Sequence, residues 1–492
     1  MASLSDKAGF LIAANFVKYA VGFVVPMLLV RLLSKDDYGT FQQTQLIATM
    51  AGAVLLLGLP SSIYYFYRQD QDHARVALVQ QTIGMLCISG LVAVVVLLVI
   101  APFAATWMSN PALPMYLPIV AITAGLSIAS EHFVHFMIAQ DRYATAVMFE
   151  TGETVVRVAV LVVPLLAGYG LSGVLWAVVV FTFGRFLIRH ALLLKGIGWN
   201  LVPRPGTLFV NEQLAYSLPM CLTSMVGLIG GALDRMIIAG NFTPADYAIY
   251  TVGAMDIPLD SIFQVAVANV LRASLPSLVR DGHLEEIVRL VRESVRKLSI
   301  IMLPSFVFLF GFAYEFITLL FTNSYSESVT VFRIYLWLVP LHMMILSPIP
   351  QAFGKTKINF YLVALVTAIH MVLSFSLLHW IGYLGPAIAN IGSTYLLALL
   401  YFIIGMRLLK TSPLKLFPLV PALRVLGASA LALVVARQAF SGAGNTLLNF
   451  VLAGGLFSLV FFLAAIALRV FTAQDRELAR RWAGRLRLRR SV

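Results

Sequence analysis

The sequence has little charge and almost no cysteine for its length. Charged residues make up 12% of the 492 residues and hydrophobic residues 60%, whereas a soluble domain has about 25% charged residues. So few charges cannot cover a water-facing surface, and the composition therefore excludes an ordinary soluble protein. The two cysteines, Cys87 and Cys221, lie in apolar stretches and lack the spacing of a disulfide framework or a zinc site.

Signatures of enzymes and of secreted proteins are also missing. The polar loops contain no Gly-rich phosphate loop, nucleophile elbow or acidic cluster. The first apolar stretch, from about Gly9 to Leu33, is too long for the core of a signal peptide, and no small-residue cleavage site follows it. We therefore interpret this stretch as an uncleaved first membrane span.

Long apolar runs dominate what remains. In lipid the backbone must satisfy its own hydrogen bonds, which leaves helices or closed barrels, and runs of ~20–28 residues favour helices. The sequence therefore predicts an all-α membrane protein with about fourteen transmembrane helices. Their approximate limits are 8–33, 40–66, 75–104, 112–139, 143–167, 171–195, 210–238, 245–271, 296–321, 328–353, 357–380, 384–409, 417–438 and 446–470.

Basic residues are distributed unevenly between the predicted loops. If the N-terminus is cytoplasmic and the loops alternate, most of the 35 Lys and Arg residues are cytoplasmic, Arg185 and Arg189 among them. The external loops then hold only Arg31, Lys35 and Arg437. This positive-inside pattern predicts a bacterial cytoplasmic (inner) membrane protein with both termini in the cytoplasm.

A weak internal repeat divides the chain. Segments 34–41 and 243–250 share the pattern Ser/Thr-x-x-Asp-Tyr-small-x-aromatic, which is typical of a helix N-cap with an acidic first turn. A second pair of similar segments, 171–173 and 384–386, is separated by nearly the same number of residues. Two bundles of equal orientation fit this repeat, as in parallel-repeat transporters. The predicted domains are a six-helix bundle at 1–205, a second at 206–412, two additional helices at 413–470 and a basic cytoplasmic tail at 471–492.

The basic tail from Arg476 to Arg490 also invites a nucleic-acid interpretation. We favour an anchor that lies against anionic lipid, with Trp482 at the membrane interface. No nucleic-acid partner is therefore expected.

Two segments resemble a known family. Residues 28–39, which read LLVRLLSKDDYG, are similar to the end of the first span of Wzx-type polysaccharide flippases, and residues 58–66, GLPSSIYYF, to the end of the second. These transporters belong to the multidrug/oligosaccharidyl-lipid/polysaccharide (MOP) exporter superfamily. The resemblance implies a MATE-like fold and translocation of undecaprenyl-diphosphate-linked oligosaccharide for O-antigen, capsule or exopolysaccharide synthesis.

The resemblance also implies the partners. These are the lipid-linked oligosaccharide, membrane lipids, a coupling proton or sodium ion, and associated polysaccharide polymerase and glycosyltransferases. No cofactor is implied.

Charged residues inside the first and fifth spans are the first candidates for a cavity, because ionisable groups at membrane depth are costly. Lys18 lies ~15 Å into its span, and is either a cation that meets the diphosphate or the partner of a buried carboxylate. Glu150, Glu153 and Arg157 share one helical face. We expect Glu153 and Arg157, four residues apart, to pair, and the stripe to be a proton relay, a sugar-binding wall or a structural ion pair.

The fourth span carries Glu131, His132 and His135. Glu131 and His135 are four residues apart and are expected to face the cavity. Zinc sites need three or four ligands in another order, and no metal site is therefore expected.

Acidic residues mark the second bundle. Asp234 and Arg235 close the seventh span, and Asp256 and Asp260 are expected on one face of the eighth. Two such carboxylates repel, which makes them candidates for proton or cation coupling. The alternative is that they pair with Arg235 or Lys18 across the cavity.

Three other functions compete with the polysaccharide flippase. A membrane glycan polymerase or ligase would be an enzyme with a long, reactive external loop, and the external loops here are short and nearly uncharged. A cation-coupled multidrug exporter of the same superfamily would share the fold and the acidic pairs. A lipid-II flippase would share the two additional helices, but it typically gathers several arginines in its cavity.

Overall fold

A computed structural model describes residues 4–67, 72–197, 209–442, 444–472 and 475, and every regular element in this part of the chain is a helix. Ten segments are long and apolar enough to cross a membrane, which confirms the all-α membrane protein. The number of fourteen spans stays a prediction. The helix α7 (Tyr143–Leu166) carries three charged residues and is not among the ten segments. The helices α17 (Thr356–Ile381) and α18 (Gly385–Leu409) together count as a single apolar segment.

The chain packs as two compact units. Unit 1 contains residues 1–254 and 363–390, and unit 2 contains residues 255–362 and 391–492. They differ from the predicted bundles because α9 (Val210–Asn241) and α10 (Pro244–Gly253) pack on helices of the first half. The predicted domain limits stay a prediction.

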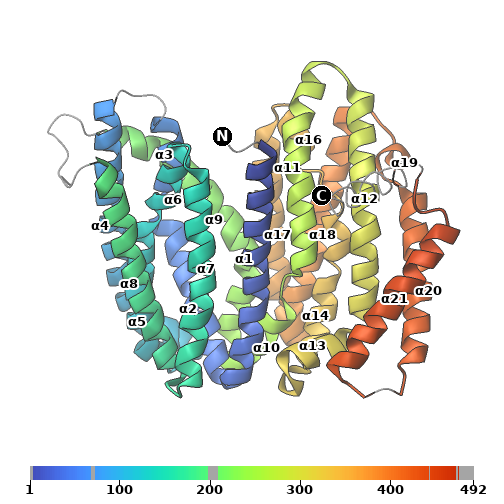
Figure 1. Cartoon of the computed structure of the whole chain (residues 1–492), viewed down its shortest axis with the longest axis horizontal. Coiled ribbons are helices and arrows are strands. Elements are labelled where there is room, and N and C mark those ends of the chain that lie inside the picture. The colour runs from blue at the N-terminus through green and yellow to red at the C-terminus, as the bar shows by residue number, and fades with distance from the viewer. Residues whose placement is uncertain (1–3, 68–71, 198–208, 443, 473–474, 476–492) are drawn as a thin grey trace, which may run out of the picture. The chain divides into compact units, whose positions relative to one another are not determined.

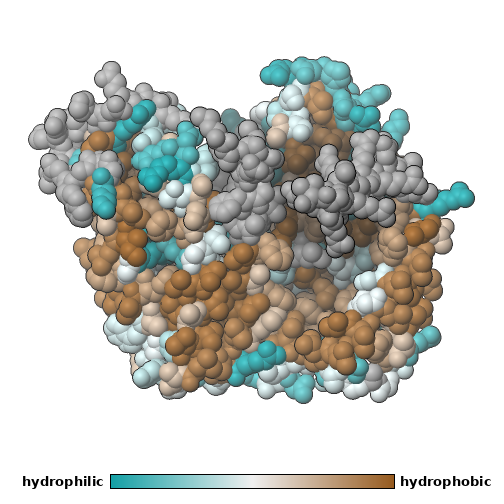
Figure 2. Space-filling view, viewed as in Figure 1, coloured by the Kyte–Doolittle hydropathy of each residue, from teal (hydrophilic) through white to brown (hydrophobic). Residues whose placement is uncertain are grey.

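Unit 1 is a helical bundle in which α5, α7 and α8 pack side by side (Figure 1). The surface along the middle of these helices is mainly hydrophobic, with hydrophilic residues toward the helix ends (Figure 2). This is the surface that lipid requires. Besides α7, α9, α10 and residues 363–390, the unit contains α1 (Leu4–Leu32), α2 (Lys35–Leu55), α3 (Leu59–Phe66), α4 (Asp72–Trp107), α5 (Leu113–Ser130), α6 (His132–Ala139) and α8 (Gly170–Ile197).

The two repeated segments begin helices, as their pattern predicts. Ser34 Oγ accepts a hydrogen bond from the backbone N–H of Asp37 (3.1 Å) at the start of α2. Thr243 forms a capping box at the start of α10. The two starts also pack on each other, because a Cβ atom at Gly39 would lie 1.8 Å from the backbone oxygen of Pro244.

A buried polar network fastens the start of α9 to α3 and α4. Gln81 Nε2 donates to Gln213 Oε1 (2.7 Å), and Gln213 Nε2 donates to Ser62 Oγ (2.9 Å) and Thr82 Oγ1 (3.0 Å). All four side chains are buried and hydrogen-bonded, so the network fixes α9 without leaving a polar group unsatisfied.

Unit 2 is built around α12 (Leu284–Gly311), which packs against α11 (Pro258–Arg280) and α20 (Leu419–Ala439). Near one end of α12, Arg437 of α20 donates to Glu315 of α13 (2.6 Å), and its guanidinium lies 4.2 Å from the Phe312 ring centroid. The remaining helices are α13 (Ala313–Phe321), α14 (Ser328–Leu336), α15 (Val339–His342), α16 (Pro348–Ala352), α19 (Pro413–Leu416) and α21 (Leu447–Ala467), with short 3-10 turns at Asn323–Tyr325 in unit 2 and Gly382–Leu384 in unit 1.

In the other half of α12, a side chain binds Asp475, the last residue of the chain that the structure describes. Arg296 pairs with Glu293 (2.6 Å) and with Asp475 (2.8 Å). The hydrogen bonds from Arg296 hold the pKa of Asp475 well below its usual range. The predicted tail anchor, residues 476–492, lies outside the described residues.

Candidate functional site

Unit 1 contains a polar cavity of about 230 Å³ among α1, α5, α7 and α8. An adjoining cavity of the same volume shares Ser127, Glu131 and Arg157 with it and extends to Gln45 and Thr49 of α2. Seven charged side chains line the first cavity, of which four are cationic and three acidic: Lys18, Arg157, Arg185, Arg189, Glu131, Glu150 and Glu153.

Lys18 forms an ion pair with Glu150 and so ties α1 to α7. Each side chain is about one third exposed, at 37% and 34%. Of the two interpretations of Lys18, the geometry matches the carboxylate partner. A direct contact between Lys18 and a substrate stays a prediction.

The predicted pair of Glu153 with Arg157 is wrong, because Glu153 pairs with Arg189 of α8. Arg189 Nε donates to Glu153 Oε1 (2.9 Å) and Nη2 donates to Oε2 (2.6 Å). A guanidinium approaching from the neighbouring helix presents both donors to both oxygens, a bidentate geometry stronger than a single contact along one helix. Arg189 is 4% exposed and also donates to the backbone oxygen of Ser130 (3.1 Å).

Two guanidinium groups in the cavity have no carboxylate partner among the described residues. Arg185 donates to Ser127 Oγ (2.9 Å), and Arg157 makes no hydrogen bond or ion pair within the described part of the chain. Arg185 lies within electrostatic range of Glu153 and Glu131 as well as of Arg157, although none of the three forms a hydrogen bond or ion pair with it. With Lys18 and Arg189 paired to glutamates, Arg157 and Arg185 are the remaining cations of the cavity and Glu131 is its remaining acid, so the cavity keeps an excess of positive charge.

The break between α5 and α6 places Glu131 beside the cavity. Glu131 lies between the last residue of α5 and the first of α6, and it lines both cavities. His135 instead lies with its ring centroid 5.4 Å from that of Tyr64, and it does not line either of these cavities. Among the described residues, no group of three His, Cys, Asp or Glu side chains has the arrangement of a metal site.

Asp256 and Asp260 do not share a helical face, which corrects the prediction, although both line one small cavity of about 30 Å³. Residues 254–257 separate α10 from α11, because Pro258 opens α11 and disfavours helical backbone at the residue before it. Asp256 is exposed, whereas Asp260 is 1% exposed. No described residue donates a hydrogen bond to the Asp260 carboxylate. A carboxylate buried in this way is far less costly when protonated, and Asp260 therefore remains a candidate for proton coupling.

Asp234 and Arg235 lie within α9 and not at its end. Asp234 is buried and accepts a hydrogen bond from the hydroxyl of Tyr250 (3.1 Å). Arg235 Nη2 donates to the backbone oxygen of Ala254 (3.4 Å). Neither residue lines the two cavities described above. Their role in a transport path stays a prediction.

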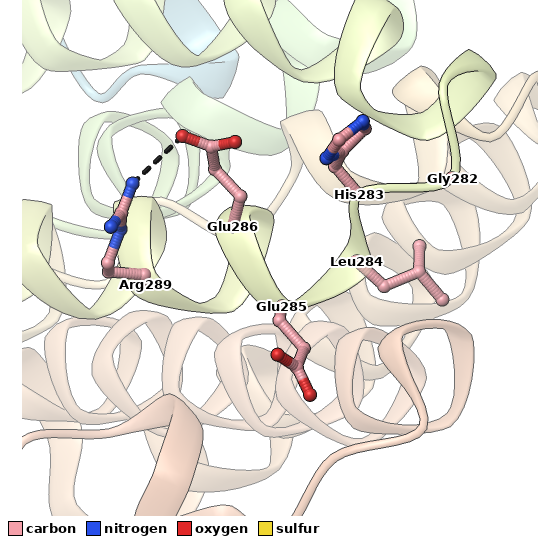
Figure 3. A pocket seen from close by; sticks show the side chains of 6 residues that line it. All are labelled: Gly282, His283, Leu284, Glu285, Glu286 and Arg289. Atoms are coloured by element: carbon pink, nitrogen blue, oxygen red, sulfur yellow. Dashed lines mark hydrogen bonds and ion pairs between the residues drawn. The ribbon is translucent and has the colours of Figure 1, made fainter.

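An open hollow at the turn between α11 and α12 is less suited to binding. Glu286 pairs with Arg289 (2.9 Å), while Glu285 points the other way, as Figure 3 shows. The side chains do not converge on one point, and the Arg289 side chain is 79% exposed. We read this pair as a solvated surface pair.

Arg185 and Arg189 line the cavity but were not predicted as site residues, because the positive-inside pattern placed them in a cytoplasmic loop. They stand four residues apart at the edge of an apolar run. The same spacing singled out Glu153 and Arg157. Applied to residues 171–195, it would have indicated a second charged helical face.

Comparisons with known proteins show which folds this chain is similar to. Three solved structures are similar in fold. The first is "Lipid II flippase MurJ, inward closed conformation" (TM-score 0.70, 14% identity, 93% of this chain and 99% of that one). The second is an inward-facing multidrug resistance MATE family transporter of the MOP superfamily (TM-score 0.64, 15% identity, 81% of this chain and 95% of that one). The third is a MOP superfamily transporter from Pyrococcus furiosus (TM-score 0.55, 15% identity, 82% of this chain and 96% of that one).

The sequence comparisons identify the family. No curated protein matches the chain. Residues 28–330, more than half of the chain, match the family described as "Polysaccharide biosynthesis protein". The chain therefore belongs to the polysaccharide biosynthesis protein family, and it has the MurJ- and MATE-like fold of the MOP superfamily.

Proposed function

We propose that this protein is a flippase for undecaprenyl-diphosphate-linked oligosaccharide repeat units. It moves them across the cytoplasmic membrane for the synthesis of a surface polysaccharide such as O-antigen, capsule or exopolysaccharide. The family and the fold support a MOP-type transporter. The observation that supports a lipid diphosphate as the substrate is the pair of cavity guanidinium groups without a carboxylate partner, Arg157 and Arg185. The family description favours a polysaccharide precursor over lipid II.

The chemistry of the substrate explains why such a cavity is needed. The lipid tail can stay in the bilayer, but an unpaired diphosphate in lipid has a very large solvation cost. Guanidinium groups bind phosphate oxygens with two parallel hydrogen bonds, and the low dielectric strengthens that contact. In our proposal Arg157 and Arg185 hold the diphosphate, and the Lys18–Glu150 and Glu153–Arg189 pairs hold the cavity wall.

Replacing Arg157 or Arg185 with Gln is expected to lower transport at least tenfold, because each hydrogen bond to a charged group is worth about 1.5–3 kcal/mol. Replacement with Lys retains part of the activity, since the charge survives without the bidentate geometry. Accumulation of lipid-linked oligosaccharide on the cytoplasmic leaflet and loss of surface glycan are the readouts.

Arg280→Gln is the matched control, because this side chain is 79% exposed and lies outside the cavity. It should transport like the wild type. Full surface glycan in both cavity variants at normal abundance would remove these arginines from the mechanism. Full surface glycan in a deletion strain without a paralogue would remove the flippase assignment.

A lipid-II flippase remains the second candidate, because the fold of this chain is similar to that of MurJ and lipid II carries the same diphosphate. Rescue of a strain that lacks its own lipid-II flippase would favour it. Rescue of surface glycan alone favours the first proposal.

We further propose that both termini face the cytoplasm, as the basic residues predict. Single cysteines replacing Ser109, Ser324 and Ser491 test this orientation in intact cells. An impermeant thiol reagent is expected to label positions 109 and 324 and to spare position 491. Labelling of 491 in sealed cells would reverse the orientation. The last of these positions lies outside the described residues.

A further inference from the structure

The second cavity of unit 1, which adjoins the charged one, has a wall of different character. Apart from the residues that the two cavities share, every side chain that lines it is uncharged. Gln45 and Thr49 of α2 are the polar members of this wall, and they stand among apolar residues of α2, α5 and α8. In our proposal the charged cavity holds the diphosphate, whereas the second cavity has no occupant.

One face of α2 forms much of this wall. Gln45 and Thr49 stand four residues apart and Gly52 three residues further on, which places all three on one side of the helix. A Cβ atom built at Gly52 would meet no neighbouring atom within 4 Å, so the space in front of it is open. The helix α2 therefore turns a polar and sterically open face toward the cavity.

Two hydrogen-bonding side chains of the cavity have no partner among the described residues. The Gln45 amide offers donors and an acceptor, and the Glu131 carboxylate offers acceptors. Neither side chain makes a hydrogen bond or ion pair within the described part of the chain. The hydroxyls of Thr49 and Thr123 donate to the backbone of their own helices and can still accept. An apolar occupant would leave these groups unpaired, which is costly.

A sugar matches this wall, whereas an alkyl chain does not. A pyranose ring carries hydroxyls that both donate and accept, and small-ligand sites commonly combine apolar walls with a few placed polar groups. The first sugar of the substrate is covalently bonded to the diphosphate, so it must lie beside the groups that hold the diphosphate. Arg157 lines both cavities and stands at that junction.

We propose that the second cavity is the subsite for the sugar attached to the diphosphate, with Gln45 and Glu131 hydrogen-bonded to the sugar hydroxyls. The inference rests on the proposed function and deepens it, because it names the residues that recognise the sugar. The competing role is that of a water-filled extension that only hydrates Arg157.

Binding of two lipids to the purified full-length protein separates these roles. The first probe is undecaprenyl diphosphate without sugars, and the second is the undecaprenyl-diphosphate-linked oligosaccharide that accumulates in a deletion strain. Gln45→Leu keeps a side chain of similar size but removes its hydrogen-bonding groups. It is expected to bind the glycosylated lipid about 3- to 10-fold more weakly. Its affinity for the lipid without sugars should be that of the wild type.

Three further variants sharpen the test. Gly52→Leu places a bulky side chain in the open space on the same face of α2, and it should weaken binding of the glycosylated lipid about tenfold or more while sparing the other lipid. Arg157→Gln should weaken both lipids, because both carry the diphosphate. Gln438→Leu makes the matched change at an exposed position of α20 that lines neither cavity, and it should leave both affinities unchanged.

The outcomes distinguish failure of the subsite from failure of the function. Loss of affinity for the glycosylated lipid alone supports the subsite. Wild-type affinity of Gln45→Leu and Gly52→Leu for that lipid would overturn it and favour the water-filled extension. Equal losses for both lipids would also overturn it, because α2 would then act on the arginines that hold the diphosphate. If the wild type binds neither lipid, the proposed function itself fails.

Discussion

Replacement of Glu153 or Arg189 alone is expected to destabilise the protein strongly, whereas replacement of both together restores most of the stability. Glu153→Gln leaves the buried Arg189 charge without its partner, which costs about 3–5 kcal/mol, and Arg189→Gln leaves the less buried Glu153, at 18% exposure, without its bidentate partner. Arg189 is 4% exposed, so water cannot replace the lost contact. The melting temperature of the purified protein and its abundance in membranes measure the effect.

The control for this prediction lies on the same helix. Arg157 stands four residues from Glu153, but the carboxylate of Glu153 is held by Arg189. Arg157→Gln should therefore keep the wild-type melting temperature, although we expect it to lose transport. Destabilisation by Arg157→Gln that Glu153→Gln reverses would instead restore the pair that the sequence predicted.

Alanine at Gly39 is expected to break the packing of α2 on α10. Its Cβ would lie 1.8 Å from the Pro244 oxygen and 2.4 Å from the Pro244 carbon. These are backbone atoms, so no side-chain rotation relieves the overlap and one of the helices must shift. We expect a loss at or above the upper end of the usual about 1–3 kcal/mol for overpacking, read as a lower melting temperature.

Gly52→Ala is the matched change on the same helix. No neighbouring atom lies within 4 Å of the added Cβ at Gly52, and alanine is the better helix former. The melting temperature should stay the same or rise slightly. Equal destabilisation by both substitutions would show that the contact with Pro244 is not the cause.

Several features of the protein could be read from local sequence. The N-caps at Ser34 and Thr243 were predicted correctly because a cap depends on residues within one helical turn. The charged residues of the first, fourth and fifth spans were found because charge in an apolar run is visible without a structure. Lys18, Glu131, Glu150, Glu153 and Arg157 all line one cavity.

Other features depend on local backbone detail that the apolar pattern hides. Asp256 and Asp260 have the spacing of one helical face, but the break before Pro258 leaves only Asp260 on α11. The predicted span ran through this break, because hydrophobicity does not distinguish one long helix from two short ones.

The sequence by itself determined the solvent, the helical class and which helices carry charge, because these follow from composition and from neighbours along the chain. Only the tertiary structure decided which charges meet. Glu153 has an arginine four residues away on its own helix and another on α8, and the second holds it with two hydrogen bonds. That choice depends on how α7 and α8 pack. It leaves Arg157 and Arg185 without carboxylates among the described residues, which is the property that the proposed function uses.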